Sequence, residues 1–97
     1  MDINVVAPGH ANFSDVEEYY TSALITKYDV FEFIKEIEVR IKKDNEEYNV
    51  KLIASLEKSP KVMAEGSERN ESMAFKNAMK KLDSIIRRYK SKRFHGI

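Results

Sequence analysis

Positive charge gathers near one end of this chain, on side chains of the kind that bind phosphate. Between Lys76 and Arg93 there are eight basic residues and one acid, Asp83, a net charge of +7. The preceding 75 residues carry nine basic residues and fifteen acids, a net charge of −6, so the overall +1 hides a strongly polarised molecule. A dense cationic face attracts a polyanion, which in a small protein is typically nucleic acid. We predict phosphate contacts at Lys76, Lys80, Lys81, Arg87, Arg88, Lys90, Lys92 and Arg93.

An ordinary solvated surface is the alternative explanation of this segment. Such surfaces mix both signs, because acid–base pairs three or four residues apart support a helix. Cations in the last turn also complement the helix dipole, but this accounts for only part of the excess. The crowding of like charges therefore favours nucleic-acid binding.

Residues for other chemistry are scarce. The chain has no cysteine, and its two histidines, His10 and His95, are far apart in sequence, so we expect no metal site. Three isolated glycines cannot form a phosphate loop, and no carboxylates are paired across a cleft for acid–base work. We therefore predict a protein without catalysis, cofactor or small-molecule substrate.

The length and the apolar pattern set the overall organisation. Ninety-seven residues make one domain, residues 1–97, that can bury roughly 60–70% of its unfolded surface. No basic-then-apolar leader opens the chain, and no apolar run approaches the ~20 residues of a membrane span. We expect a cytoplasmic protein with no membrane partner.

A long amphipathic helix must present the basic residues. Asn70 is a suitable N-cap, and Gly96 lies past the predicted end. The apolar residues recur every three or four positions, which is the helical period. They are Phe75, Ala78, Met79, Leu82, Ile85, Ile86 and Tyr89. We expect the Tyr89 ring to pack in the core while its hydroxyl reaches water.

The upstream residues predict one further helix and four strands. A short strand at residues 3–6 precedes a helix that opens with a capping box, Ser14 and Glu17. Alternation of apolar and polar residues from Glu36 to Lys42 and from 50 to 56 predicts two strands, and residues 61–65 form a last strand that Gly66 ends. The inner face of the second of these strands carries Val50, Leu52, Ala54 and Leu56. Five aromatic residues are predicted to be core rather than a platform for bases: Tyr19, Tyr20, Tyr28, Phe31 and Phe33.

These elements give an α+β fold in the order β-α-β-β-β-α. We expect a four-stranded sheet with both helices on one face, because the apolar stripes of both helices must be buried against the same face of the sheet.

The order of elements and the last third of the chain resemble the ribosome hibernation-promoting factors, including the ribosome-associated inhibitor protein of the same superfamily. The resemblance spans nearly the whole chain and rests on a combination of short motifs. These are Ala64-Glu65-Gly66 near the end of the last strand, Met73-Ala74-Phe75 at the start of the helix, Lys81-Leu82, and Arg88-Tyr89-Lys90-Ser91-Lys92.

The resemblance implies a fold like that of double-stranded-RNA-binding domains, and binding to the 16S-type rRNA of the small ribosomal subunit. It further implies that the protein occupies the channel for messenger and transfer RNA and silences idle ribosomes under stress. Lys81, Arg88, Lys90 and Lys92 match basic positions of the family helix, whereas Lys80, Arg87 and Arg93 follow from charge and helical spacing.

Two departures from the family pattern bear on the footprint and on dimerisation. The first helix of the family usually carries several lysines, but here only Lys27 remains, and we include it among the RNA contacts. The chain matches the short form, in which pairing of ribosomes would require a second hibernation factor. Two alternatives stay open: a double-stranded-RNA module acting away from the ribosome, and a non-catalytic domain that docks an acidic protein.

Overall fold

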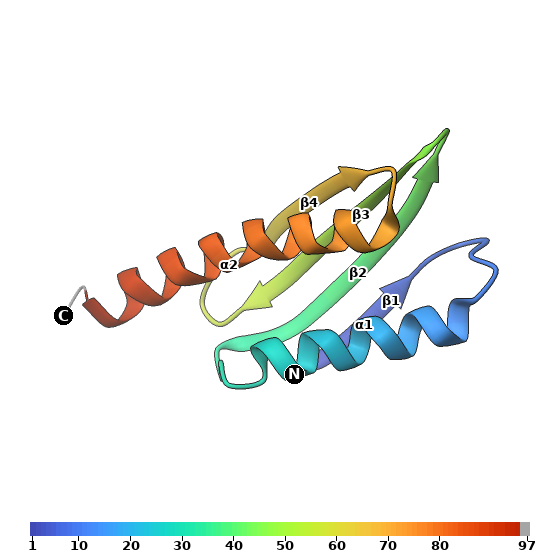
Figure 1. The fold of residues 1–97 in the computed structure, drawn as a ribbon. Coiled ribbons are helices and arrows are strands. Elements are labelled where there is room, and N and C mark those ends of the chain that lie inside the picture. The colour runs from blue at the N-terminus through green and yellow to red at the C-terminus, as the bar shows by residue number, and fades with distance from the viewer. Residues whose placement is uncertain (96–97) are drawn as a thin grey trace.

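The computed structural model describes residues 1–95, and the side chains of residues 1–92. Four strands and two helices alternate in the predicted order, as Figure 1 shows. They are β1 (Asp2–Val6), α1 (Phe13–Tyr28), β2 (Ile34–Asp44), β3 (Glu47–Leu56), β4 (Val62–Glu68) and α2 (Glu71–His95).

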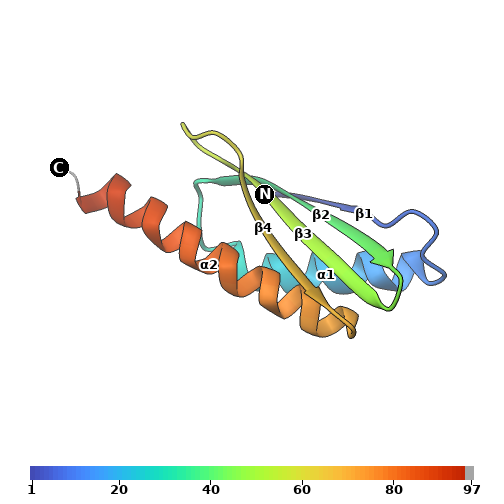
Figure 2. The ribbon, with the colours of Figure 1, turned by 90° about the horizontal axis from the view of Figure 1, so that it is seen from above.

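The strands form one mixed sheet in the order β1-β2-β3-β4. β1 and β2 are parallel because α1 carries the chain back between them, and the remaining pairs are antiparallel. Both helices lie on the same face of the sheet and leave the other face open (Figures 1 and 2). The predicted α+β class and β-α-β-β-β-α order are confirmed.

Alternation along the strands places the apolar side chains under the helices. Val39 of β2 pairs with Leu52 of β3, which pairs in turn with Ala64 of β4, and all three are buried. The predicted inner positions Val50, Leu52, Ala54 and Leu56 are likewise all buried. Most of the intervening positions on the open face are polar, as alternation requires, but Ile53 of β3 pairs there with the exposed Met63 of β4.

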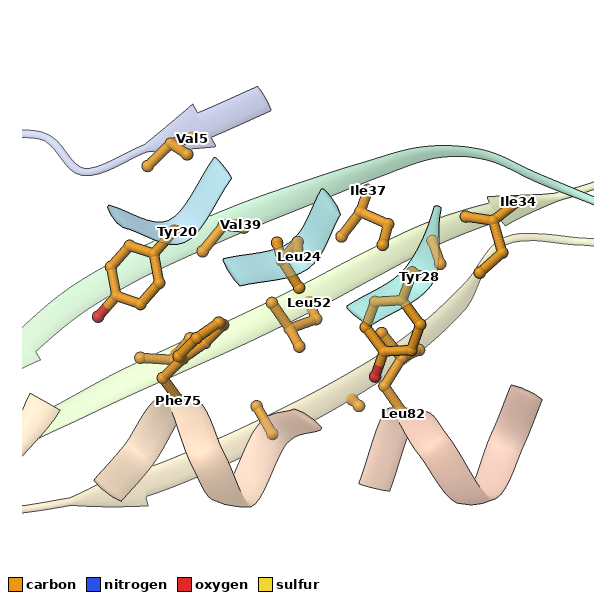
Figure 3. Close-up of a cluster of buried hydrophobic side chains, with 14 of the residues drawn as sticks. Val5, Tyr20, Leu24, Tyr28, Ile34, Ile37, Val39, Leu52, Phe75 and Leu82 are labelled. Carbon is orange, nitrogen blue, oxygen red and sulfur yellow. The ribbon is translucent and has the colours of Figure 1, made fainter. Parts of the chain in front are cut away.

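The core lies between this inner face and the two helices. Figure 3 shows Tyr20, Leu24 and Tyr28 of α1 directed toward Phe75 and Leu82 of α2 above the strands. The Tyr20 and Phe75 rings meet edge to face with centroids 4.4 Å apart, which favours contact of a positive ring edge with a negative ring face. Each of these large side chains stabilises the fold by roughly 1.5–3 kcal/mol through burial.

The predicted end of the last strand is wrong. β4 runs through Gly66 to Glu68, and Gly66 is buried directly beneath α2. A Cβ at this position would collide with the backbone oxygen of Ala74 and lie 2.8 Å from the amide nitrogen of Ala78. The glycine therefore permits a close approach of helix to strand instead of breaking the strand.

Three details of the side-chain predictions are also wrong. α1 begins at Phe13 with Asn12 as its N-cap and no side-chain cap, so Ser14 lies inside the first turn and no capping box forms. Tyr19 is 54% exposed, whereas Tyr20, Tyr28 and Phe33 are buried as predicted. The Tyr89 hydroxyl, which the sequence assigns to water, donates a hydrogen bond to the backbone oxygen of Glu57.

Candidate nucleic-acid interface

The helix α2 is the longest element of the molecule and extends beyond the sheet that it covers. Its 25 residues span about 37 Å. The helix packs against the core as far as Ile86 and Tyr89, and its last turns project past the end of the sheet (Figures 1 and 2). This projection contributes to an elongated shape with principal extents of 48 × 21 × 20 Å.

The cap predicted for this helix is confirmed. Asn70 accepts a hydrogen bond at its side-chain oxygen from the amide of Met73, at 3.1 Å. The cap sets where the helix begins and so which residues face outward. Ala74, Phe75, Ala78, Leu82 and Ile86 are buried, and Met79, Ile85 and Tyr89 pack partly against the core.

The basic residues occupy the opposite side of α2. All seven whose side chains the structure describes are exposed: Lys76, Lys80, Lys81, Arg87, Arg88, Lys90 and Lys92. We call these seven residues the basic face. Arg93 belongs to α2, but its side chain lies outside the described residues.

The one acid in this segment is paired with residues of α1 at a partly exposed position. Asp83 points toward α1, where its carboxylate accepts a 2.5 Å hydrogen bond from the hydroxyl of Tyr28. Its other oxygen lies 3.0 Å from the ammonium of Lys27. The negative charge is therefore directed into the space between the two helices and balanced there, so it subtracts little from the field of the basic face.

This pairing revises the position of Lys27. The sequence places it in the first helix as a separate RNA contact, and the structure brings its ammonium beside α2. Its side chain is still 42% exposed. Lys27 thus joins the edge of the basic face while shielding Asp83, a relationship that spacing in the sequence does not reveal.

None of the basic face is used in an ion pair among the described residues. The ion pairs found there are His10–Glu71, Lys27–Asp83, Lys35–Glu57 and Arg40–Glu38. Crowded cations without carboxylate partners repel one another, and a polyanion would relieve that repulsion. The arrangement is therefore suited to phosphate groups rather than to internal stabilisation.

Two residues of the basic face have additional contacts. The ammonium of Lys81 donates a 2.8 Å hydrogen bond to the backbone oxygen of Glu65 on the outer strand β4. Lys90 lies 5.7 Å from the centroid of the Phe31 ring, within reach of a cation–π contact. Lys80, Arg87 and Arg88 are exposed, and their side chains have no such partner among the described residues.

Charge is also separated along the long axis. Acidic residues cluster at the tip of the β2–β3 hairpin and at the starts of both helices, at the end opposite to the C-terminus of α2 (Figure 1). They are Asp15, Glu17, Glu18, Asp44, Glu46, Glu47 and Glu71. The acids outnumber the bases Lys42, Lys43 and Arg69 near this hairpin, so a polyanion is held less strongly there than along the C-terminal part of α2.

Other kinds of site lack support in the described residues. No group of three or more potential metal ligands is found among them. Neither described helix has the length and apolar character that crossing a bilayer requires. Burial raises the pKa of Tyr20 and of Tyr28, with Glu71 and Asp83 adding to the effect, so both phenols serve as neutral core groups.

A hollow of about 900 Å³ lies on the open face of the sheet near the β2–β3 hairpin. Its lining mixes both signs, with Lys42, Lys51 and Arg69 facing Asp44, Glu46, Glu47 and Glu65. Such a mixed surface has no net attraction for a polyanion. The basic face therefore remains the candidate site.

Comparison with known proteins identifies the same fold in solved structures. No model of a known protein family matches the sequence, and no curated protein sequence is significantly similar to it. A ribosomal subunit interface protein from Coxiella burnetii superposes with a TM-score of 0.80 at 17% identity, over 95% of this chain and 100% of that one. The N-terminal domain of Protein Y from Thermus thermophilus gives 0.76 at 14% identity, over 92% and 99%.

The fold is the one that the sequence resemblance predicted. Both neighbours are matched over essentially their full length. At this low identity the superposition establishes the arrangement of strands and helices, whereas the function must be argued from the site.

Proposed function

We propose that this chain is a ribosome hibernation factor that binds the small ribosomal subunit through the basic face and blocks translation by occupying the channel for messenger and transfer RNA. The observation that carries the proposal is the basic face itself. Seven exposed cations line one helix, none of them is paired with a described carboxylate, and the single acid among them is neutralised by Lys27. The fold shared with a ribosomal subunit interface protein supports the ribosome as the source of the RNA.

Recognition of this kind depends on shape and backbone rather than on base sequence. Structured RNA presents its phosphates and 2′-hydroxyls across a shallow minor groove, and a straight helix rich in lysine and arginine can follow such a row of charges. The chemistry needs no cofactor. It also requires no catalytic group, which agrees with a factor that acts by occupying space.

Salt dependence is the physical signature of this binding mode. A protein that neutralises about six phosphates releases the condensed counterions, and its affinity falls about a thousandfold between 50 and 200 mM salt. The excess of acids at the opposite end of the molecule disfavours binding in the reverse orientation.

Sedimentation with small subunits and whole ribosomes through sucrose gradients tests the proposal. We expect salt-sensitive co-migration with the small subunit, together with inhibition of translation in a cell-free system. The site is tested by the triple variant K80E/R87E/R88E, whose three positions are exposed and make no other described contact. The matched control is K42E/K43E/K61E, which changes the net charge equally at two exposed positions of β2 and one exposed position just before β4.

The two variants separate the possible outcomes. Loss of co-migration in the helix variant, with the control bound as the wild type, supports the basic face. Equal loss in both would mean that only net charge matters. Absence of the wild-type protein from every ribosomal fraction at low salt would contradict the proposal, and stronger binding to a plain RNA duplex than to ribosomes would favour an RNA-binding module that acts elsewhere.

A further inference from the structure

A cleft opens where α2 leaves the sheet, between that helix and the turn that joins β3 to β4. Its volume is about 480 Å³, and it is lined by Lys58, Ser59, Pro60, Tyr89 and Lys92. This volume lies within the range of ~300–1,000 Å³ that is typical of sites for small organic groups. The cleft adjoins the basic face, because Lys92 belongs to both.

The lining combines two cations with two ring systems. Lys58 comes from the turn and Lys92 from the helix, while Pro60 and Tyr89 supply the rings. The acid next to the turn, Glu57, does not line the cleft, and its carboxylate lies 3.7 Å from the ammonium of Lys35. Cations beside an aromatic surface are the usual means of holding a nucleotide, with the base against the ring and the phosphate against the ammonium.

The aromatic wall is fixed before any ligand arrives. The Tyr89 hydroxyl donates a hydrogen bond to the backbone oxygen of Glu57. The centroids of the Tyr89 and Phe33 rings lie 4.9 Å apart. Phe33 is buried in the core. A ring held in this way loses little conformational freedom on binding, which lowers the cost of complex formation.

Lys58 occupies a backbone conformation that few residues of its type adopt. Its φ angle is 55°, in the left-handed region that favours glycine and asparagine. The β2–β3 turn uses the same conformation at Asn45, with a φ of 57°, and there the residue is one that turn chemistry prefers. Strained backbone held by a non-glycine residue is concentrated at functional sites. The β3–β4 turn thus places a charged side chain beside the cleft at a backbone position that favours glycine or asparagine.

We infer that this cleft binds one unpaired nucleotide of RNA, with the base on Tyr89 and Pro60 and the adjacent phosphate between Lys58 and Lys92. The inference rests on the proposed function for the nature of the polymer and adds to it a second element, the β3–β4 turn. The basic face binds the phosphates of duplex RNA through charge. The cleft binds only where one base is unpaired and has left the base stack. Lys58 thereby becomes a specificity-determining residue.

Binding to two small RNA hairpins tests this inference. The two have the same length and differ in a single bulged nucleotide, and affinity is measured by fluorescence anisotropy at several salt concentrations. We expect the wild type to prefer the bulged RNA on the order of tenfold, the usual effect of stacking one base on an aromatic side chain. Lys58→Gly removes one of the two cations that hold the phosphate and relieves the left-handed strain, so it keeps the fold while reducing the preference several-fold.

Two further variants complete the design. Lys92→Ala removes the second cation from the other element and is expected to reduce the preference in the same way, which keeps the test valid should Lys58→Gly alter the turn. Lys61→Ala is the matched control, because it removes one exposed cation near the turn that does not line the cleft. It should leave the preference unchanged.

The inference is overturned if the wild type binds both hairpins equally, or if Lys58→Gly and Lys92→Ala both keep the preference. These results are distinct from failure of the proposed function. Ribosome binding that is lost in K80E/R87E/R88E but kept in Lys58→Gly, without any bulge preference, would contradict the cleft alone. A bulge preference that depends on Lys58 in a protein that ignores ribosomes would support the cleft and contradict the ribosomal role.

Discussion

The hydroxyl of Tyr28 donates a 2.5 Å hydrogen bond to the carboxylate of Asp83, and so links α1 to α2 between residues 55 positions apart. Tyr28 is 1% exposed, and its ring belongs to the core. Its hydroxyl therefore needs a partner, and Asp83 is the acid that would otherwise weaken the basic face. One contact both satisfies a buried polar group and turns a carboxylate away from the proposed RNA site.

Loss of this contact should weaken the fold and change its response to alkaline pH. Tyr28→Phe keeps the ring but removes a hydrogen bond to a charged group, at an expected cost of about 1.5–3 kcal/mol in the free energy of unfolding. Urea denaturation measures this cost. Tyr19→Phe is the control, because Tyr19 is largely exposed, and it should change the free energy by less than about 0.5 kcal/mol.

The free energy of unfolding should decrease at alkaline pH. Burial and Asp83 raise the pKa of Tyr28 above its ordinary value of 10.0, and burial and Glu71 raise that of Tyr20. Below pH 10.0 the folded and unfolded states both hold the two protons, so the stability is fully present. Above it the unfolded chain releases them first, and stability falls by about 1.4 kcal/mol per pH unit for each tyrosine. Tyr28→Phe should reduce this slope by the contribution of one tyrosine. An unchanged slope would contradict the raised pKa of Tyr28.

Gly66 should tolerate no side chain. In Gly66→Ala the new methyl group would meet the backbone of Ala74 and Ala78, which cannot move without shifting α2 away from β4. We expect a loss of at least about 2 kcal/mol in the free energy of unfolding, the effect of overpacking against rigid atoms. Gly9→Asn is the control, since Gly9 has open space around it and asparagine accepts its φ of 74°. A stable Gly66→Ala variant with unchanged α2 packing would refute this account.

Local patterns in the sequence predicted the parts of the structure that depend on neighbours along the chain. Alternation around Val39 and Leu52 indicated which strand faces are buried, and the spacing from Phe75 to Tyr89 indicated which side of α2 is exposed. Asn70 marked the start of that helix correctly. These signals are strong because each follows directly from the period of one element.

The remaining features arise from contacts between distant segments. Gly66 is a typical strand terminator by composition, and only the position of α2 above it explains why the strand continues. In the sequence, Asp83 reduces the positive charge of the helix. Only the structure shows that Lys27 and Tyr28 lie beside its carboxylate. The left-handed backbone of Lys58 belongs to a turn whose residues do not predict it. For Gly66 and Asp83, contacts with distant segments override what the local sequence indicates.

The two helix caps provide a matched pair for stability. Asn70→Ala removes the hydrogen bond from the amide of Met73 and should lower the free energy of unfolding by about 1 kcal/mol. Asn12→Ala removes a side chain that forms no cap bond at the start of α1, so its effect should stay below about 0.5 kcal/mol. Thermal or urea unfolding distinguishes the two, and equal costs would show that the cap contact at Asn70 is not formed in solution.

The role of Lys27 can be separated from that of an ordinary phosphate contact. Lys27→Ala removes one cation and also exposes the charge of Asp83, so ribosome or RNA affinity should fall more than for Lys61→Ala, which removes a cation alone. Adding Asp83→Asn removes the uncovered negative charge while its amide oxygen still accepts from Tyr28. If Lys27 acts by shielding Asp83, the double variant recovers affinity close to that of the wild type. If Lys27 binds phosphate directly, Lys27→Ala and the double variant remain equally weak, and the salt dependence of both falls by about one contact.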